Sequence, residues 1–163
     1  MPDYPKPDFL ALLRALNGHQ VNFIVIGGIC AVLHGAPVNT FDLDVVHSRQ
    51  AANIERLMAA LQALDAYYRT HPGKKLRPQA SHLSSPGRQL LMTRYGPFDV
   101  SGAVAGGRGY EELLPHSTAM PVGGNVRVRV LNLETLIEIK EATGGEEDVA
   151  VLPLLRRTLS EKR

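Results

Sequence analysis

An apolar run followed by two glycines constrains the fold of this chain more than any other stretch. The segment FIVI at residues 23–26 is rich in β-branched residues and too short for a helix, so it predicts a buried strand. Gly27-Gly28 interrupts the run, and residues 29–34 then predict a short helix that Gly35 ends. We therefore expect a strand that passes through a tight glycine turn directly into a helix.

Two carboxylates follow on the next predicted strand. Asp42 and Asp44 are separated by Leu43, and Val45-Val46 continues the apolar pattern. Because strand side chains alternate in direction, both carboxylates point to the same face, roughly 7 Å apart. Like charges at that spacing repel each other unless a cation lies between them, and Mg²⁺ is the natural occupant where phosphate is the substrate. The spacing thus predicts a divalent-metal site.

The order of strand, Gly-Gly, helix, turn and Asp-x-Asp resembles the nucleotidyltransferase superfamily related to DNA polymerase β. The pattern GGxxAxxHGxPxxTxDLDVV, at residues 27–46, is most similar to the small prokaryotic branch that includes AbiEii-type toxin nucleotidyltransferases. The resemblance implies that the backbone amides of Gly27 and Gly28 hold a triphosphate, and that Thr40 orients the loop or touches phosphate. In one departure, Val38 stands where the branch commonly has arginine.

The same resemblance implies a third carboxylate. In the family it comes from a strand next to the Asp-x-Asp strand, and Asp99 is the sole acidic residue between Asp65 and Glu111. The resemblance implies that Asp42, Asp44 and Asp99 are the catalytic residues and bind two Mg²⁺ ions. It also implies that Asp99 takes the proton of the acceptor.

Composition is typical of a globular chain and argues against several other classes. The chain has 163 residues and 44% hydrophobic content, which favours one domain with a real core. A net charge of +2 is too small to indicate nucleic-acid binding by itself. Cys30 is the only cysteine, so an internal disulfide is excluded. We find no signal peptide and no apolar run near the roughly 20 residues of a membrane span, so the expected location is the cytoplasm.

Periodicity predicts the remaining elements. Helices are expected at residues 9–16 and 50–64, strands at 66–69, 89–95 and 98–101, a loop at 70–87, and a hairpin at 117–122 and 125–131. Two C-terminal helices follow, with Val149, Leu152 and Leu155 of the second expected to face inward. Lys140 and Asp148 on these helices predict an ion pair, with phosphate contact by the lysine as the alternative. The basic residues of the loop region are either solvated or border the active cleft: Lys74, Lys75, Arg77 and Arg88.

Together these features predict an α/β (α+β) fold with a small mixed β-sheet and flanking helices. We expect a single domain over residues 1–163, with an N-terminal helix within 1–20 and C-terminal helices within 132–158. The predicted function is metal-dependent transfer of a nucleoside monophosphate from an NTP to an acceptor: an RNA end such as that of tRNA, a protein or a small molecule. The alternative is a catalytically worn nucleotidyltransferase-fold module that partners a cognate protein in a toxin–antitoxin-like system. No membrane partner is expected.

Overall fold

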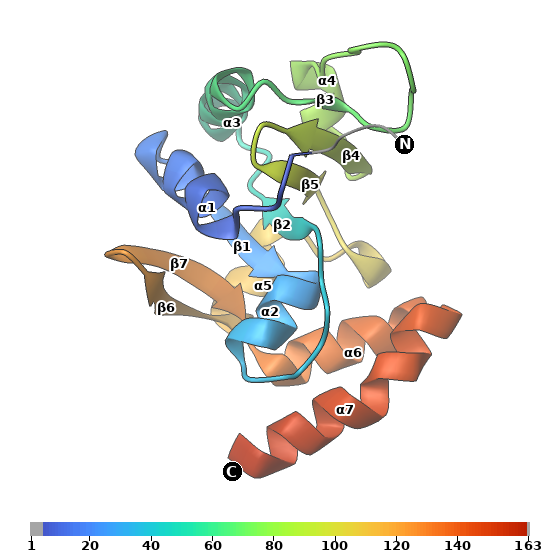
Figure 1. The fold of residues 1–163 in the computed structure, drawn as a ribbon. Helices are drawn as coiled ribbons and strands as arrows, with labels where there is room; N and C mark the ends of the chain where they lie inside the picture. Colours follow the sequence, from blue (N-terminus) through green and yellow to red (C-terminus); the bar gives the residue numbers. More distant parts are fainter. Residues whose placement is uncertain (1–4, 163) are drawn as a thin grey trace.

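A computed structural model of the chain describes residues 5–162, and Figure 1 shows its ribbon. The helices are α1 (Phe9–Gly18), α2 (Gly27–Leu33), α3 (Ala51–Ala63), α4 (Ala80–Ser84), α5 (Tyr110–Leu113), α6 (Leu133–Thr143) and α7 (Glu146–Lys162), with short 3-10 turns at Ala105–Gly107 and Leu114–His116. The strands are β1 (Phe23–Ile26), β2 (Leu43–His47), β3 (Tyr67–Tyr68), β4 (Arg88–Thr93), β5 (Gly96–Ser101), β6 (Ser117–Gly123) and β7 (Val126–Leu131).

Within residues 5–162, seven strands form one mixed sheet in the order β3-β4-β5-β2-β1-β7-β6. Strand β1 pairs antiparallel with β2 and parallel with β7, while β2 pairs parallel with β5. All four residues of β1 are buried, so both faces of the sheet are covered at its centre. The strands that carry the Gly-Gly and Asp-x-Asp segments therefore lie in the middle of the molecule. The predicted α/β fold with a mixed sheet and flanking helices is confirmed.

The helices that follow the sheet close one end of the molecule. Helix α7 lies beside α6, and α2 also packs against α6 (Figure 1). Leu152 and Leu155 of α7 are buried in the core, which fixes the α6–α7 pair to the rest of the chain. No helix within residues 5–162 combines the length and the apolar composition that crossing a bilayer requires.

Two local predictions are wrong. The expected loop at 70–87 contains α4, because Leu83 is fully buried and Nδ1 of His82 accepts a hydrogen bond from the backbone N–H of Gln79 at the start of the helix, at 3.0 Å. Val149 does not face inward but is 52% exposed. Three residues turn about 300° around a helix, about 60° short of a full turn, so Val149, six residues before the buried Leu155, lies about 120° away from it.

Candidate functional site

Sheet pairing brings the three predicted carboxylates together. Asp44 of β2 is the register partner of Asp99 on β5, and on its other side it faces Ile26, the residue before Gly27. Asp42 lies one residue ahead of β2 and, by strand alternation, on the same face as Asp44. Burial increases along the series: the side chain of Asp42 is 42% exposed, that of Asp44 19% and that of Asp99 0%.

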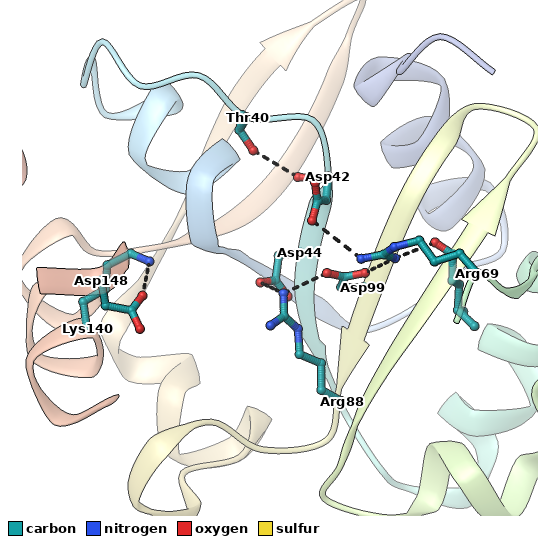
Figure 2. Close-up of polar contacts among 9 residues, drawn as sticks. Thr40, Asp42, Asp44, Arg69, Arg88, Asp99, Lys140 and Asp148 are labelled. Atoms are coloured by element: carbon teal, nitrogen blue, oxygen red, sulfur yellow. Dashed lines mark hydrogen bonds and ion pairs between the residues drawn. The ribbon is translucent and has the colours of Figure 1, made fainter. Parts of the chain in front are cut away.

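Two arginines join these carboxylates (Figure 2): Arg69, which the sequence did not assign to the site, and Arg88, which the sequence predicts to be either solvated or at the border of the cleft. Arg69, just after β3, places Nη1 at 2.5 Å from Asp99 Oδ1 and Nη2 at 3.7 Å from Asp42 Oδ2. Arg88, the first residue of β4, places Nη2 at 2.8 Å from Asp99 Oδ2 and at 3.4 Å from Asp44 Oδ2. Each guanidinium group therefore bridges Asp99 to one of the other two carboxylates.

The pairing of β4 with β5 explains why Arg88 reaches the site. In this antiparallel pair Leu90 is opposite Asp99 and Arg88 is opposite Ser101, so Arg88 projects to the same face as the aspartates. The predicted strands at 89–95 and 98–101 carried this information in principle, since the short turn between them sets the register. Among the other basic residues of the segment, Lys75 and Arg77 pair instead with Asp65.

Asp44 is the least satisfied of the three carboxylates. Its Oδ1 is buried and has no hydrogen-bond partner among the described residues. Burial raises the pKa of Asp44 to about 7, although Arg88 acts in the opposite direction and nearby Asp99 and Asp42 raise it further. A buried oxygen without a partner is costly, which favours either protonation or a bound cation at this position.

The two glycines allow α2 to start directly against this face. Gly27 has a φ of +70°, and a Cβ there would lie 3.0 Å from both Cβ and Oδ2 of Asp44. A Cβ on Gly28 would lie 2.6 Å from Oγ1 of Thr40. Thr40 in turn donates a hydrogen bond from Oγ1 to the carbonyl of Asp42 at 3.3 Å. Both glycines are thus required by close packing, whether or not a ligand also approaches them.

A cleft of about 540 Å³ opens beside these residues. Its walls carry four acidic side chains against two basic ones, a formal sum of −2. Lys140 on this wall pairs with Asp148 at 3.0 Å, which confirms the predicted ion pair (Figure 2). The lining includes Gly27, Gly28, Thr40, Asp42, Asp44, Arg88, Lys140, Glu147 and Asp148.

Comparison with known proteins identifies the fold and no closer relationship. No family model matches the chain, and no curated protein does. Among solved structures, the chain is similar to a putative nucleotidyltransferase from Thermotoga maritima, with a TM-score of 0.57 and 18% identity over 93% of this chain and 90% of that one. The chain has a nucleotidyltransferase-type fold. At 18% identity the likeness describes the fold alone. A shared fold does not specify an activity, which depends on the residues of the cleft.

The carboxylate oxygens of Asp42, Asp44 and Asp99 are suitable ligands for a hard divalent cation. In the structure, however, these carboxylates are paired with arginine side chains. Within residues 5–162, no three histidine, cysteine or carboxylate side chains form a ready-made metal site. Arg69 and Arg88 lie between the three aspartates instead. Oδ1 of Asp44 is nevertheless a buried oxygen that no group in the described part of the chain satisfies, and an all-oxygen donor set is the one that Mg²⁺ prefers.

Two further residues with chemically reactive side chains, Cys30 and His34, have structural roles. Cys30 is buried, and burial raises the pKa of its thiol to about 12, so it is not a nucleophile. His34, at the end of α2, contacts the Leu131 carbonyl through Nε2 at 2.7 Å and Lys162 through Nδ1 at 2.7 Å. These contacts tie α2 and α7 to β7.

Proposed function

We propose that the chain is a metal-dependent nucleotidyltransferase that moves a nucleoside monophosphate from an NTP to an acceptor hydroxyl or phosphate. The observation that carries the proposal is the buried Oδ1 of Asp44 on the wall of the cleft, which has no hydrogen-bond partner within residues 5–162. Asp44 lies where β2 meets the start of α2, with its Cβ and Oδ2 close to Gly27, and it is the register partner of a second carboxylate, Asp99, on β5. The nucleotidyltransferase-type fold is consistent with this assignment.

The charge of the cleft supports the requirement for metal. With a formal sum of −2 on its walls, the cleft repels a polyphosphate unless cations reverse the sign. Asp42 and Asp44 would hold Mg²⁺, which supplies charge neutralisation at the phosphates and activation of the acceptor oxygen. Asp99 would be a further ligand, and it must first exchange at least one of its two arginine partners.

The remaining groups bind and orient the substrate. Backbone amides at Gly27 and Gly28 would hold the β- and γ-phosphates, and Thr40 keeps the adjoining loop in place through the Asp42 carbonyl. In the reaction the acceptor oxygen bonds to the α-phosphorus, and the bond to the leaving pyrophosphate breaks. The proton of the acceptor passes to a carboxylate, for which Asp99 is the candidate. The acceptor class stays open among RNA ends, proteins and small molecules.

A worn site in a toxin–antitoxin-like partner protein is the second candidate. The specific observation in its favour is that Arg69 and Arg88 already pair with all three aspartates and offset two of their three negative charges. Val38, in the position where the resembled branch has arginine, points the same way. Such a module would need no Mg²⁺ and would bind NTP weakly or not at all.

The test is calorimetric binding of the four NTPs to the full chain, with and without Mg²⁺. We expect wild-type binding with Mg²⁺ and at least tenfold weaker binding in Asp44→Asn. The matched control is Asp65→Asn, which removes a charge from an exposed ion-pair network that does not line the cleft. Equal binding by wild type and Asp44→Asn would remove Asp44 from the site.

A second measurement separates the two candidate functions. Labelled NTPs are incubated with a cellular extract and the chain, and label is followed into RNA, protein and small molecules. Transfer by wild type that Asp44→Asn lacks supports the enzyme. Absence of both transfer and Mg²⁺-dependent NTP binding in wild type supports the worn module.

A further inference from the structure

Arg88 differs from the other cations near the site in being both exposed and on the cleft wall. Its side chain is 54% exposed and lines the cleft. Within the described part of the chain, its guanidinium group makes hydrogen bonds only to Asp44 and Asp99, through a single nitrogen, Nη2. The remaining donors of its fork are available to a ligand without any change in the backbone.

Arg69 and Lys140 are held more firmly. Arg69 is 21% exposed, and its Nη1 donates to the Leu91 carbonyl at 2.8 Å as well as to Asp99. Lys140 is bound to Asp148 across the α6–α7 pair at 3.0 Å. Of these three cations, Arg88 is therefore the one that can change partners at least cost.

We propose that Arg88 is a polyphosphate-binding residue that exchanges Asp44 and Asp99 for phosphate oxygens when divalent cations bind those carboxylates. The inference rests on the proposed function and adds to it the group that recognises the phosphates. A guanidinium fork matches two phosphate oxygens, as it matches a carboxylate. Cations that take over Asp44 and Asp99 release the fork within the same cleft, while Arg69 stays with Asp99.

This exchange has a thermodynamic signature. Arg88 competes with metal for the carboxylates, so its removal strengthens the binding of metal alone. Arg88 also contributes directly to phosphate binding, so its removal weakens the binding of a metal–polyphosphate complex. A residue with a merely structural role would not move the two affinities in opposite directions.

The experiment uses Arg88→Gln in the full chain. Calorimetry with Mn²⁺ alone is expected to show at least threefold tighter binding than in wild type. Binding of inorganic tripolyphosphate with saturating Mg²⁺ is expected to be at least tenfold weaker. Arg157→Gln, which removes an exposed arginine that pairs with Glu161 on the same helix, is the charge-matched control and should match wild type in both titrations.

Arg88→Lys keeps the positive charge but lacks the two-pronged guanidinium group. It serves as a second variant in case Arg88→Gln does not fold. It should fall between wild type and Arg88→Gln for tripolyphosphate, with thermal unfolding recorded for each variant. Normal tripolyphosphate binding in a folded Arg88→Gln or Arg88→Lys overturns this inference and leaves the proposed function standing. A variant that loses affinity for both Mn²⁺ and Mg–tripolyphosphate has the same meaning. A wild type that binds neither Mn²⁺ nor Mg–tripolyphosphate overturns both the inference and the proposed function.

Discussion

At the scale of single residues, Asp44 is the one of the three aspartates whose charge is least completely compensated. It is one of four acidic side chains on the wall, and its Oδ1 is buried without a partner among the described residues. Its neighbour Asp99 is more deeply buried but is compensated by two guanidinium groups. The position with the less complete compensation is therefore the one where a proton or a cation has the larger effect.

This difference predicts a pH dependence of stability in metal-free protein. Burial raises the pKa of Asp44 from 3.8 to about 7, so the native state binds this proton more tightly than the unfolded chain. Its contribution to stability is fully present below about pH 4 and is lost as the pH rises to about 7. Asp44→Asn has no such titration, so relative to wild type it should gain on the order of 1–4 kcal/mol between pH 4 and pH 8.

The measurement is urea unfolding of both proteins across this pH range with a chelator present. The two profiles of unfolding free energy against pH should diverge as the pH rises. Parallel profiles would mean that Asp44 is ionised in the native state throughout, and that its buried oxygen is satisfied in some other way.

At the scale of elements, the turn from β1 into α2 is shaped by the loop that precedes β2. Gly28 faces Thr40, and Thr40 holds the Asp42 carbonyl. The glycine pair is therefore explained first by packing between two local segments. A substitution at Gly28 tests that packing and not only the space for a phosphate.

Gly28→Ala is expected to lower the free energy of unfolding by about 1–3 kcal/mol, because the added Cβ would lie 2.6 Å from Thr40 Oγ1. In a Thr40→Gly background the cost should be smaller, since the side-chain atoms that the added methyl group would meet are gone. Gly18→Ala is the control, because a Cβ at that position would have no described atom within 4 Å. Chemical denaturation measures the loss of unfolding free energy in each background. Equal losses from Gly28→Ala with and without the Thr40 side chain would show that this side chain does not restrict the space at Gly28.

At the scale of the whole molecule, the α6–α7 pair closes the cleft on the side away from β4. Lys140 and Asp148 bring one charge from each helix to the cleft wall. The pair keeps its position because α7 places Leu155, which is 0% exposed, in the common core. The position of the Lys140–Asp148 pair on the cleft wall thus depends on the packing of Leu155 in the core.

Leu155→Ala should destabilise the protein by about 2–5 kcal/mol, through lost burial and the cavity left behind. Val149→Ala on the same helix is the control and should change stability by about 0.5 kcal/mol or less, because Val149 is exposed. Urea denaturation of both variants measures the difference. Equal losses in the two variants would mean that α7 is not packed as described.

Local patterns in the sequence were sufficient for the central elements and for Asp42 and Asp44. The strand, the Gly-Gly turn, the following helix and the Asp-x-Asp strand are each encoded within a few residues, by β-branched runs, glycines and alternation. The resemblance added Asp99, which sheet pairing places beside Asp44. Helix α4 was missed because the burial of Leu83 depends on segments distant in sequence, whereas the direction of Val149 follows from its position around the helix relative to Leu155.

Only the tertiary structure decided which cations meet those aspartates. Arg69 is 30 residues from Asp99, and Arg88 is 44 residues from Asp44. Their contacts follow from the strand order β3-β4-β5-β2 and from the register of each pair. A shift of one residue in the β4–β5 pairing would turn Arg88 to the opposite face, because strand side chains alternate. Sequence alone therefore determined the carboxylates, and the packing of the sheet determined their counter-ions.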